Sequence, residues 1–297
     1  MPQRTTSSKS LFRKFLVLTI AVFCFTAVHA QNSYALKSPS KEITLQFSLS
    51  ALGSLQYSLQ YKNKSIIRSS SLGLQLADGS LNNNLLITSV DSSLVNESWK
   101  PVWGEVMEIR NNYRQLVVHL KQQNPPARMM DLIFRVFNDG LGFRYYFPVQ
   151  QNMKHFIVTS ELSQFALTGN HKAFWIPGDY DSNEYPYTTS PLGDVDAQKV
   201  SDNNPEIAVR VVKDPSSVAT PLMLKTADGL YVNIHEAALV NYPAMQLHVD
   251  KSNFMLTSNL VPDGVGNKAY LQTPFSTPWR TIIVSDKAAD ILPPSSS

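Results

Sequence analysis

Hydrophobic and polar residues alternate with a period of two along several short runs. The clearest runs cover residues 42–49, 54–61 and 114–122, read as EITLQFSL, SLQYSLQY and RQLVVHLKQ. Successive side chains of a β-strand point to opposite faces of its sheet, so this alternation predicts strands with one buried face. No stretch keeps a 3.6-residue period over a dozen positions. The only local helix candidate is a short one, HEAALVNY at residues 235–242.

Two longer segments predict β-hairpins. Residues 131–149 place aromatic and β-branched runs on both sides of Asn138-Asp139-Gly140, and residues 221–239 repeat this arrangement around Asp228-Gly229. Asp-Gly pairs favour the tight turns that join antiparallel strands. Further short strands are predicted at AVRVV, MQLHV and FMLTSNLV, which are residues 208–212, 245–249 and 254–261.

The number of strands predicts an all-β fold. So many short strands with frequent turns are typical of a large antiparallel sandwich, in which two large sheets pack face to face. We expect one sandwich domain over residues 31–285. The chain then continues into a Pro- and Ser-rich end, PPSSS, and residues 286–297 are predicted to be a linker.

The first thirty residues have the pattern of a cleaved secretory signal. Four basic residues precede an apolar run at residues 15–28, and VHA supplies the cleavage pattern, so Gln31 would become the N-terminus. The apolar run is short for a membrane span of about 20 residues, and we expect none after cleavage. Cys24, the only cysteine, lies inside this segment, so the mature chain forms no disulfide. The chain is therefore predicted to be secreted or periplasmic.

Charge excludes one class of partner. The whole chain carries a net charge of +3, but residues 1–30 hold four of the 26 basic residues and none of the 23 acidic ones. The mature chain is therefore close to neutral. A nucleic-acid-binding protein needs a basic face, and nucleic acid is not an expected partner.

Carboxylates are the strongest candidates for chemistry. The mature chain has no cysteine, no G-x-S-x-G segment, no paired zinc-type histidines and no Gly-rich phosphate loop. His119 and His248 fall in predicted strands, where a structural role is favoured. Residues 174–192, FWIPGDYDSNEYPYTTSPL, place Asp179, Asp181 and Glu184 among aromatic residues. This acidic loop could hold a sugar, share a cation, or simply face water.

His235 and Glu236 form a second polar spot. Glu236 follows a predicted strand and could face the same cleft as the acidic loop or cap a turn, and a structural role is favoured. Neighbouring residues on a strand point to opposite faces, which argues against an acid–base pair made of these two.

Six segments, in order, carry a family resemblance. They are SPSKEITLQFSLSALGSLQYSLQYKNKSII, WKPVWGEVMEIRNNYRQLVVHL, VFNDGLGFRYYFP, FWIPGDYDSNEYPY, GLYVNIHEAALVNYPAMQL and TPFSTPWRTIIVSD. Together they resemble the N-terminal domain of glycoside hydrolase family 97, which comprises secreted bacterial enzymes acting on α-glucosides or α-galactosides. The resemblance implies a β-super-sandwich of the galactose-mutarotase-like group, followed in the family by a catalytic (β/α)8 barrel that these residues do not include.

The resemblance also implies a cofactor and a site. The family binds calcium mainly through glutamates of the barrel, with one glutamate from the N-terminal domain, and Glu184 matches that residue. The catalytic acid and base belong to the barrel, so no catalytic residue is expected here and the chain alone should not hydrolyse glycosides. The expected partners are an oligosaccharide or α-glycoside and a separate catalytic-barrel chain.

Two alternatives remain open. The chain could be a stand-alone secreted carbohydrate-binding module, with Trp175, Tyr180, Tyr185 and Tyr187 as a stacking platform, although aromatics of a sandwich more often lie in the core. Substrate-binding roles are predicted for Trp175, Tyr185 and Tyr187. A mutarotase-like enzyme would rest on the fold alone. A face normally covered by a barrel should be apolar and promote self-association.

Overall fold

The structure is a computed structural model that describes Met1 and residues 32–104 and 106–291. The predicted signal, residues 1–30, lies outside the described residues except for Met1. The unit that begins at Asn32 is described by itself below. No helix of the described residues is long and apolar enough to span a bilayer.

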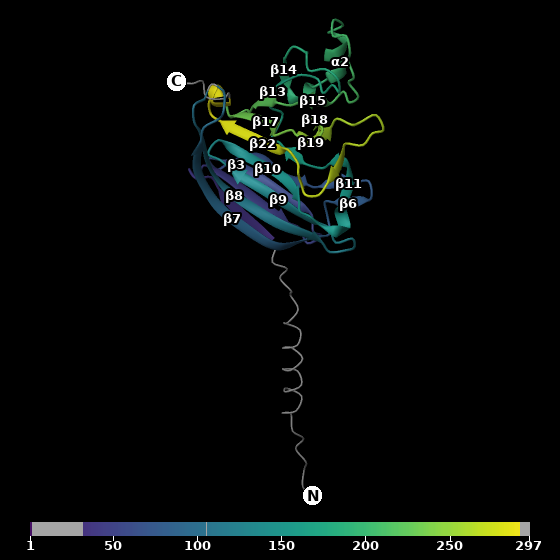
Figure 1. Cartoon of the computed structure of the whole chain (residues 1–297). Coiled ribbons are helices and arrows are strands. Elements are labelled where there is room, and N and C mark those ends of the chain that lie inside the picture. The colour runs from purple at the N-terminus through teal and green to yellow at the C-terminus, as the bar shows by residue number, and fades with distance from the viewer. Residues whose placement is uncertain (2–31, 105, 292–297) are drawn as a thin grey trace. The chain divides into compact units, whose positions relative to one another are not determined.

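Strands dominate this unit (Figure 1). The first eleven are β1 (Asn32–Lys37), β2 (Ile43–Leu49), β3 (Leu55–Tyr61), β4 (Lys64–Leu72), β5 (Leu74–Leu76), β6 (Gly79–Leu81), β7 (Leu85–Trp99), β8 (Ile109–Gln122), β9 (Met129–Val136), β10 (Gly140–Phe147) and β11 (His155–Glu161). The others are β12 (Gln164–Ala166), β13 (Lys172–Trp175), β14 (Thr188–Pro191), β15 (Ser217–Ala219), β16 (Leu222–Lys225), β17 (Tyr231–Ala237), β18 (Met245–Asp250), β19 (Met255–Leu260), β20 (Ala269–Gln272), β21 (Phe275–Ser276) and β22 (Trp279–Ser285). The helical elements are η1 (Gln151–Met153), η2 (Leu192–Asp194), α2 (Ala197–Asp202) and η3 (Ala288–Ile291).

The strands form four antiparallel sheets. The largest has the order β14-β13-β16-β17-β22-β10-β9-β8-β7, with β21 also paired to β10. Three sheets of four strands have the orders β1-β2-β3-β4, β20-β11-β5-β6 and β12-β19-β18-β15. The all-β prediction is confirmed, because the sheets are antiparallel and stack into a sandwich without a closed barrel among the described strands.

The core lies between the β1–β4 sheet and the large sheet. Inward positions of both sheets are apolar, and aromatic rings cross the interface. The ring centroids of Phe47 and Phe134 are 5.6 Å apart, and those of Tyr57 and Phe143 are 5.4 Å apart. Such pairs add to the free energy of burial because each ring removes a large apolar area from water. Figure 1 shows β3 against the ribbons of β9 and β10.

The alternating runs and both hairpins are confirmed as strands. Residues 131–149 contain β9 and β10, residues 221–239 contain β16 and β17, and MQLHV and FMLTSNLV contain β18 and β19. At the second turn Gly229 has a φ of +88°, a conformation that costs glycine little.

Three local predictions are wrong or incomplete. AVRVV forms no strand and contributes one isolated bridge, Val212 to Asp179. HEAALVNY is not helical, because residues 235–237 end β17. The six-residue helix α2 was missed, since it is too short to show a period. Its N-cap is Asp196, whose side chain accepts a hydrogen bond from the Lys199 N–H.

The described part of the predicted linker packs on the domain. Asp286 accepts a hydrogen bond from the Tyr61 hydroxyl and one from Lys62 Nζ, both at 2.8 Å. Ile291 of η3 is 7% exposed. The ordered domain therefore continues beyond residue 285, through residue 291.

Candidate functional site

The acidic loop connects two paired strands at one edge of the large sheet. It leaves the sheet at the end of β13 and returns at β14, and these strands pair antiparallel with Trp175 opposite Thr188. The twelve residues between them form no strand and make isolated bridges to residues 212 and 218. Their backbone groups are satisfied partly by backbone partners, such as the Val211 carbonyl oxygen, and partly by side chains.

Asp179 organises the loop. This carboxylate is 4% exposed and accepts four hydrogen bonds. Its Oδ1 accepts from the backbone N–H groups of Asp181 at 2.8 Å and Ser182 at 3.2 Å. Its Oδ2 accepts from the Tyr185 hydroxyl at 2.7 Å and the Val211 N–H at 2.9 Å. A carboxylate used in this way is a structural anchor and has little capacity left for a ligand.

Trp175 and Tyr185 are core residues. They are 1% and 4% exposed. Trp175 Nε1 donates to Ser190 Oγ at 3.0 Å, and burial, together with the hydrogen bond to Asp179, raises the pKa of the Tyr185 hydroxyl. Neither ring offers a free face to a sugar, so the structure corrects the stacking role predicted for these two residues. The sequence left open whether these two aromatic residues lie in the core or form a sugar-binding platform.

Glu184 and Tyr187 lie on the exposed side of the loop. Tyr187 is 61% exposed. Glu184 is also exposed, its backbone N–H donates to Ser182 Oγ at 3.2 Å, and its carboxylate forms no hydrogen bond or ion pair with any described residue. Both side chains are available to an external group, and their predicted roles stay predictions.

A cavity of about 240 Å³ joins the acidic loop to β17. Its lining includes Asp179, Asp181, His235, Glu236 and Gln246. Gln246 Nε2 donates to the Asp179 carbonyl oxygen at 2.6 Å and ties the loop to β18. The two polar spots of the sequence therefore meet at one cavity, although Glu184 does not line it.

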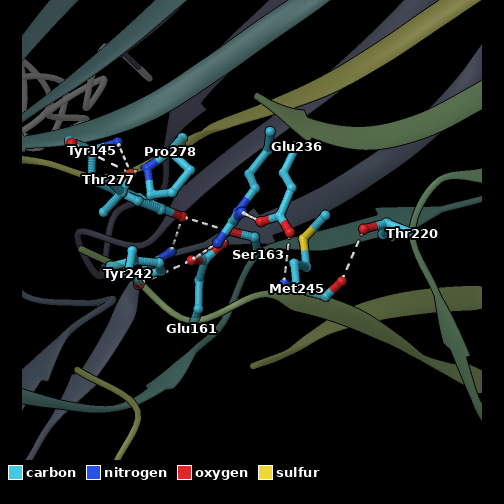
Figure 2. A network of polar contacts seen from close by, with 11 residues as sticks. Tyr145, Glu161, Ser163, Thr220, Glu236, Tyr242, Met245, Thr277 and Pro278 are labelled. Atoms are coloured by element: carbon cyan, nitrogen blue, oxygen red, sulfur yellow. Dashed lines mark hydrogen bonds and ion pairs between the residues drawn. The ribbon is translucent and has the colours of Figure 1, made fainter. Parts of the chain in front are cut away.

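Behind this cavity lies a buried ionic network (Figure 2). Arg280 on β22 is 1% exposed and binds both oxygens of Glu161, at 2.9 and 2.8 Å. Its third nitrogen binds Glu236 Oε2 at 2.6 Å. Glu236 Oε1 accepts from the Met245 N–H at 3.0 Å, and Glu161 Oε2 accepts from the Tyr242 hydroxyl at 3.1 Å. Glu236 is thus a structural group, as the sequence favoured.

The network sets the charge of its members. Burial alone would raise the pKa of Glu161, but Arg280 outweighs it and lowers that pKa. Burial would likewise lower the pKa of Arg280, and the charge of Glu161 raises it. Glu161 and Arg280 are therefore held as ions. Both oxygens of Glu236 are already engaged, one by Arg280 and the other by the Met245 N–H.

The sequence analysis missed Glu161 and Arg280. One signal pointed to Arg280, because it shares the inward parity of Ile282 and Val284 along β22. A charged residue in an apolar stripe requires a buried counter-ion. Which acid pairs with it depends on the packing of β11 against β17 and β22, and no spacing along the chain encodes that.

The histidines are structural or isolated. His119 bridges Asp131 and Asp91 at 2.8 and 3.1 Å, and His248 contacts Asp214 at 2.6 Å. His235 has a buried Nδ1 without a hydrogen-bond partner among the described residues, and burial lowers its pKa. His235 is therefore neutral near pH 7.

No cluster of three or more His, Cys, Asp or Glu side chains suited to a metal occurs within the described residues. Calcium binds six to eight oxygen ligands. The free carboxylate of Glu184 fits one such ligand, while Asp179 is already saturated by hydrogen bonds. The loop therefore fits the edge of a calcium site and does not make a complete one.

Comparison with known proteins identifies the family. The sequence profile described as Glycosyl-hydrolase 97 N-terminal matches residues 36–295. The chain belongs to this family. A family 97 enzyme from Pseudoalteromonas sp. strain K8, solved with acarbose, superposes with a TM-score of 0.75 at 30% identity, covering 87% of this chain and 36% of that one.

Curated relatives agree with the family. The retaining alpha-galactosidase of Bacteroides thetaiotaomicron is 24% identical over 94% of this chain and 42% of its own length. A probable retaining alpha-galactosidase of Streptomyces bingchenggensis is 25% identical over 92% of this chain and 39% of its own length. The chain thus spans about two fifths of the curated relatives it matches. A beta-arabinopyranosidase with a TM-score of 0.71 and 19% identity shares the fold.

Proposed function

We propose that this family 97 domain forms the non-catalytic wall of a secreted α-glycosidase site. In this role Glu184 gives one oxygen ligand to a calcium ion whose other ligands come from a catalytic barrel, and the acidic loop shapes the entrance for an α-glucoside or α-galactoside. Calcium would supply electrostatic stabilisation next to the substrate. The barrel would be supplied by a longer chain or a separate polypeptide.

One observation carries the proposal. The loop has a hydrogen-bonded base and an exposed tip: Asp179 accepts four hydrogen bonds, whereas Glu184, five residues later, is exposed and unpaired within the described chain. A buried anchor that holds a free carboxylate outward is the arrangement expected for a single ligand presented to a partner surface.

The domain is proposed to be non-hydrolytic alone. Glycoside hydrolysis uses two carboxyl groups about 5 to 10 Å apart on either side of the scissile bond. Of the acids around the cavity, Asp179 is saturated by hydrogen bonds and Glu236 is paired with Arg280, which leaves Asp181 as a single free carboxylate. Without a pair of free carboxyl groups, about 10²- to 10⁴-fold of rate from proton transfer is lost.

A stand-alone carbohydrate-binding module is the second candidate. Tyr187, 61% exposed, is the observation in its favour. The burial of Trp175 and Tyr185 weakens it, because a platform usually needs more than one ring. A glycan array on the mature chain tests it, and retained glycans that are lost with Tyr187→Ala would favour the module.

The test of the main proposal is a chimera. The chain replaces the matching part of the Pseudoalteromonas enzyme, and hydrolysis is measured against calcium concentration. We expect the Glu184→Gln chimera to need about 10-fold or more calcium for half-maximal activity, since one charged ligand is lost.

Asp181→Asn is the matched control, because Asp181 is an exposed acid of the same loop. It should leave the calcium requirement unchanged. Equal calcium requirements for Glu184→Gln and the unmodified chimera would reject the ligand role. Robust α-glycoside turnover by the mature chain alone would reject the non-catalytic role.

A further inference from the structure

A stack of aromatic and guanidinium groups crosses the outer face of the large sheet. Arg135 on β9 lies 4.7 Å from the Tyr113 ring centroid and 4.6 Å from that of Trp279. Arg144 on β10 lies 4.4 Å from the Trp279 centroid. In the sheet, Arg135 on β9 lies opposite Gly142 on β10. The Trp279 ring packs over Gly142.

Within the described residues the two guanidiniums have no counter-ion. The arginine ion pairs of the described residues involve Arg128 and Arg280, and neither Arg135 nor Arg144 pairs with a carboxylate. Arg135 Nε donates to the neutral Gln115 side chain at 3.0 Å. Arg144 Nε is buried without a partner in the described chain.

The two charges are also close together. Contacts of 4.6 and 4.4 Å to one ring centroid place the two Cζ atoms at most 9.0 Å apart. Burial, together with the like charge of Arg135, lowers the pKa of Arg144. The contact of each guanidinium with the Trp279 ring neutralises neither charge. The stack is therefore an excess of positive charge held in a defined geometry.

A cavity of about 440 Å³ opens beside the stack. Its lining includes Arg135, Leu141 and Trp279, and also the carboxylates of Asp139 and Glu236. This volume lies within the range of about 300 to 1,000 Å³ common for small-molecule sites. Arg135 is the cation that reaches this cavity. Its Nε donates to Gln115, whereas its two terminal nitrogens form no hydrogen bond with the described residues, so they are the donors available to a ligand.

We propose that this cavity binds a small carboxylate ligand of about the size of a sugar acid, with the carboxylate on the in-plane N–H groups of Arg135. A planar guanidinium matches a carboxylate with two parallel hydrogen bonds. A neutral ligand would cover Arg135 without replacing its hydration, which is costly. The carboxylates of Asp139 and Glu236 and the apolar walls disfavour a strongly hydrated dianion such as phosphate. The proposal is independent of Glu184 and calcium.

The test is calorimetric titration of the mature chain with glucuronate, with the Trp279 indole N–H followed by NMR. Glucuronate should bind and shift this resonance, and glucose should not. Arg135→Gln should weaken binding about 10- to 100-fold, as expected for the loss of a charge-assisted pair. Arg135→Lys keeps the charge and loses the two parallel hydrogen bonds, so it should bind with intermediate affinity.

Arg114→Gln is the matched control, because Arg114 is exposed on the neighbouring strand β8 and lies outside the cavity lining. It should bind like the parent. Malonate separates a general carboxylate site, where it competes with glucuronate, from one that requires the sugar ring. Equal binding of glucose and glucuronate, tighter binding of inorganic phosphate, or unchanged affinity in a folded Arg135→Gln variant would overturn the proposal.

Discussion

At the residue scale, the buried ion network is the most exacting feature of this domain. Arg280 and Glu161 are each about 1% exposed, so each charge depends on the other for compensation. An intact network of this kind contributes little to the free energy of unfolding, compared with apolar residues of the same size. Removing one member is costly, because it leaves an uncompensated charge in the core.

We therefore expect Arg280→Ala to lower the free energy of unfolding by about 3 to 5 kcal/mol. The substitution leaves Glu161 and Glu236 buried beside each other without a cation and also opens a cavity. Urea denaturation followed by circular dichroism measures the change. Arg114→Ala removes an exposed guanidinium and should stay within about 0.5 kcal/mol of the parent. A loss below about 1 kcal/mol for Arg280→Ala would contradict a compensating role.

His119 gives a pH dependence with a definite sign. Burial alone would lower the pKa of His119, but the hydrogen bonds to Asp131 and Asp91 and the charges of these acids outweigh it and raise the pKa above 6.5. The protonated form is therefore preferred in the folded state. Its stabilisation is fully present below the unfolded pKa and is lost as pH rises through the folded pKa.

The measurement compares the parent with His119→Gln by urea denaturation at about pH 5.5 and about pH 8.5. The parent should be the more stable protein at the lower pH, and the difference should shrink at the higher pH. Asp131→Asn should remove most of this dependence. A difference that grows with pH would show that the neutral histidine is preferred.

At the element scale, the sequence was most informative where local pattern and tertiary environment agree. The alternating runs and both hairpins became β2, β3, β8, β9, β10, β16 and β17. AVRVV failed because residues 208–210 are exposed and find no strand partner, so β-branched residues alone did not make a strand. HEAALVNY failed because pairing of β17 with β22 overrode a weak helix propensity.

The acidic loop is an element held by one side chain, and this can be tested. Asp179→Ala removes the acceptor of the Asp181, Ser182 and Val211 N–H groups. We expect a loss of about 3 kcal/mol, because hydrogen bonds to a carboxylate contribute about 1.5 to 3 kcal/mol each and do not add fully. Hydrogen exchange of these three amides should accelerate.

Asp181→Ala is the control for the loop. Asp181 is exposed and its carboxylate accepts no hydrogen bond from the described residues. This variant should leave the exchange of Ser182 and Val211 unchanged. Unchanged protection of those amides in Asp179→Ala would mean that backbone contacts, such as Tyr180 N–H to the Val211 carbonyl oxygen at 3.1 Å, hold the loop instead.

At the scale of the whole molecule, the fold class was predictable and the site only partly so. Strand count and turn chemistry report on architecture because they are local. The buried positions of Trp175 and Tyr185, the pairing of Arg280 with Glu161, and the stack on Trp279 all depend on contacts between distant strands. Single-sequence patterns do not contain such contacts.

Several exposed apolar side chains lie together in sequence at one end of the β7–β8 pair. These strands pair antiparallel from Leu85 opposite Gln122 to Trp99 opposite Ile109 (Figure 1). Around this end Trp99 is 47% exposed, Trp103 is 90% and Met107 is 87%. The sequence predicted an apolar face that promotes self-association. In the structure, Trp103 and Met107 of this hairpin are among the most exposed large apolar side chains.

Self-association through this end is the expected behaviour of the purified chain at high concentration, because burying exposed indole and thioether groups is favourable. The double variant Trp99→Ser and Trp103→Ser should shift sedimentation velocity profiles toward the monomer. Its melting temperature should stay close to that of the parent, since Trp103 is almost fully exposed and Trp99 about half exposed in the folded domain. Leu52→Ser, which removes an isolated side chain that is 78% exposed, is the control and should leave association unchanged. A parent chain that is strictly monomeric at high concentration would contradict the prediction. Equal association of the parent and the double variant would show that another surface is responsible.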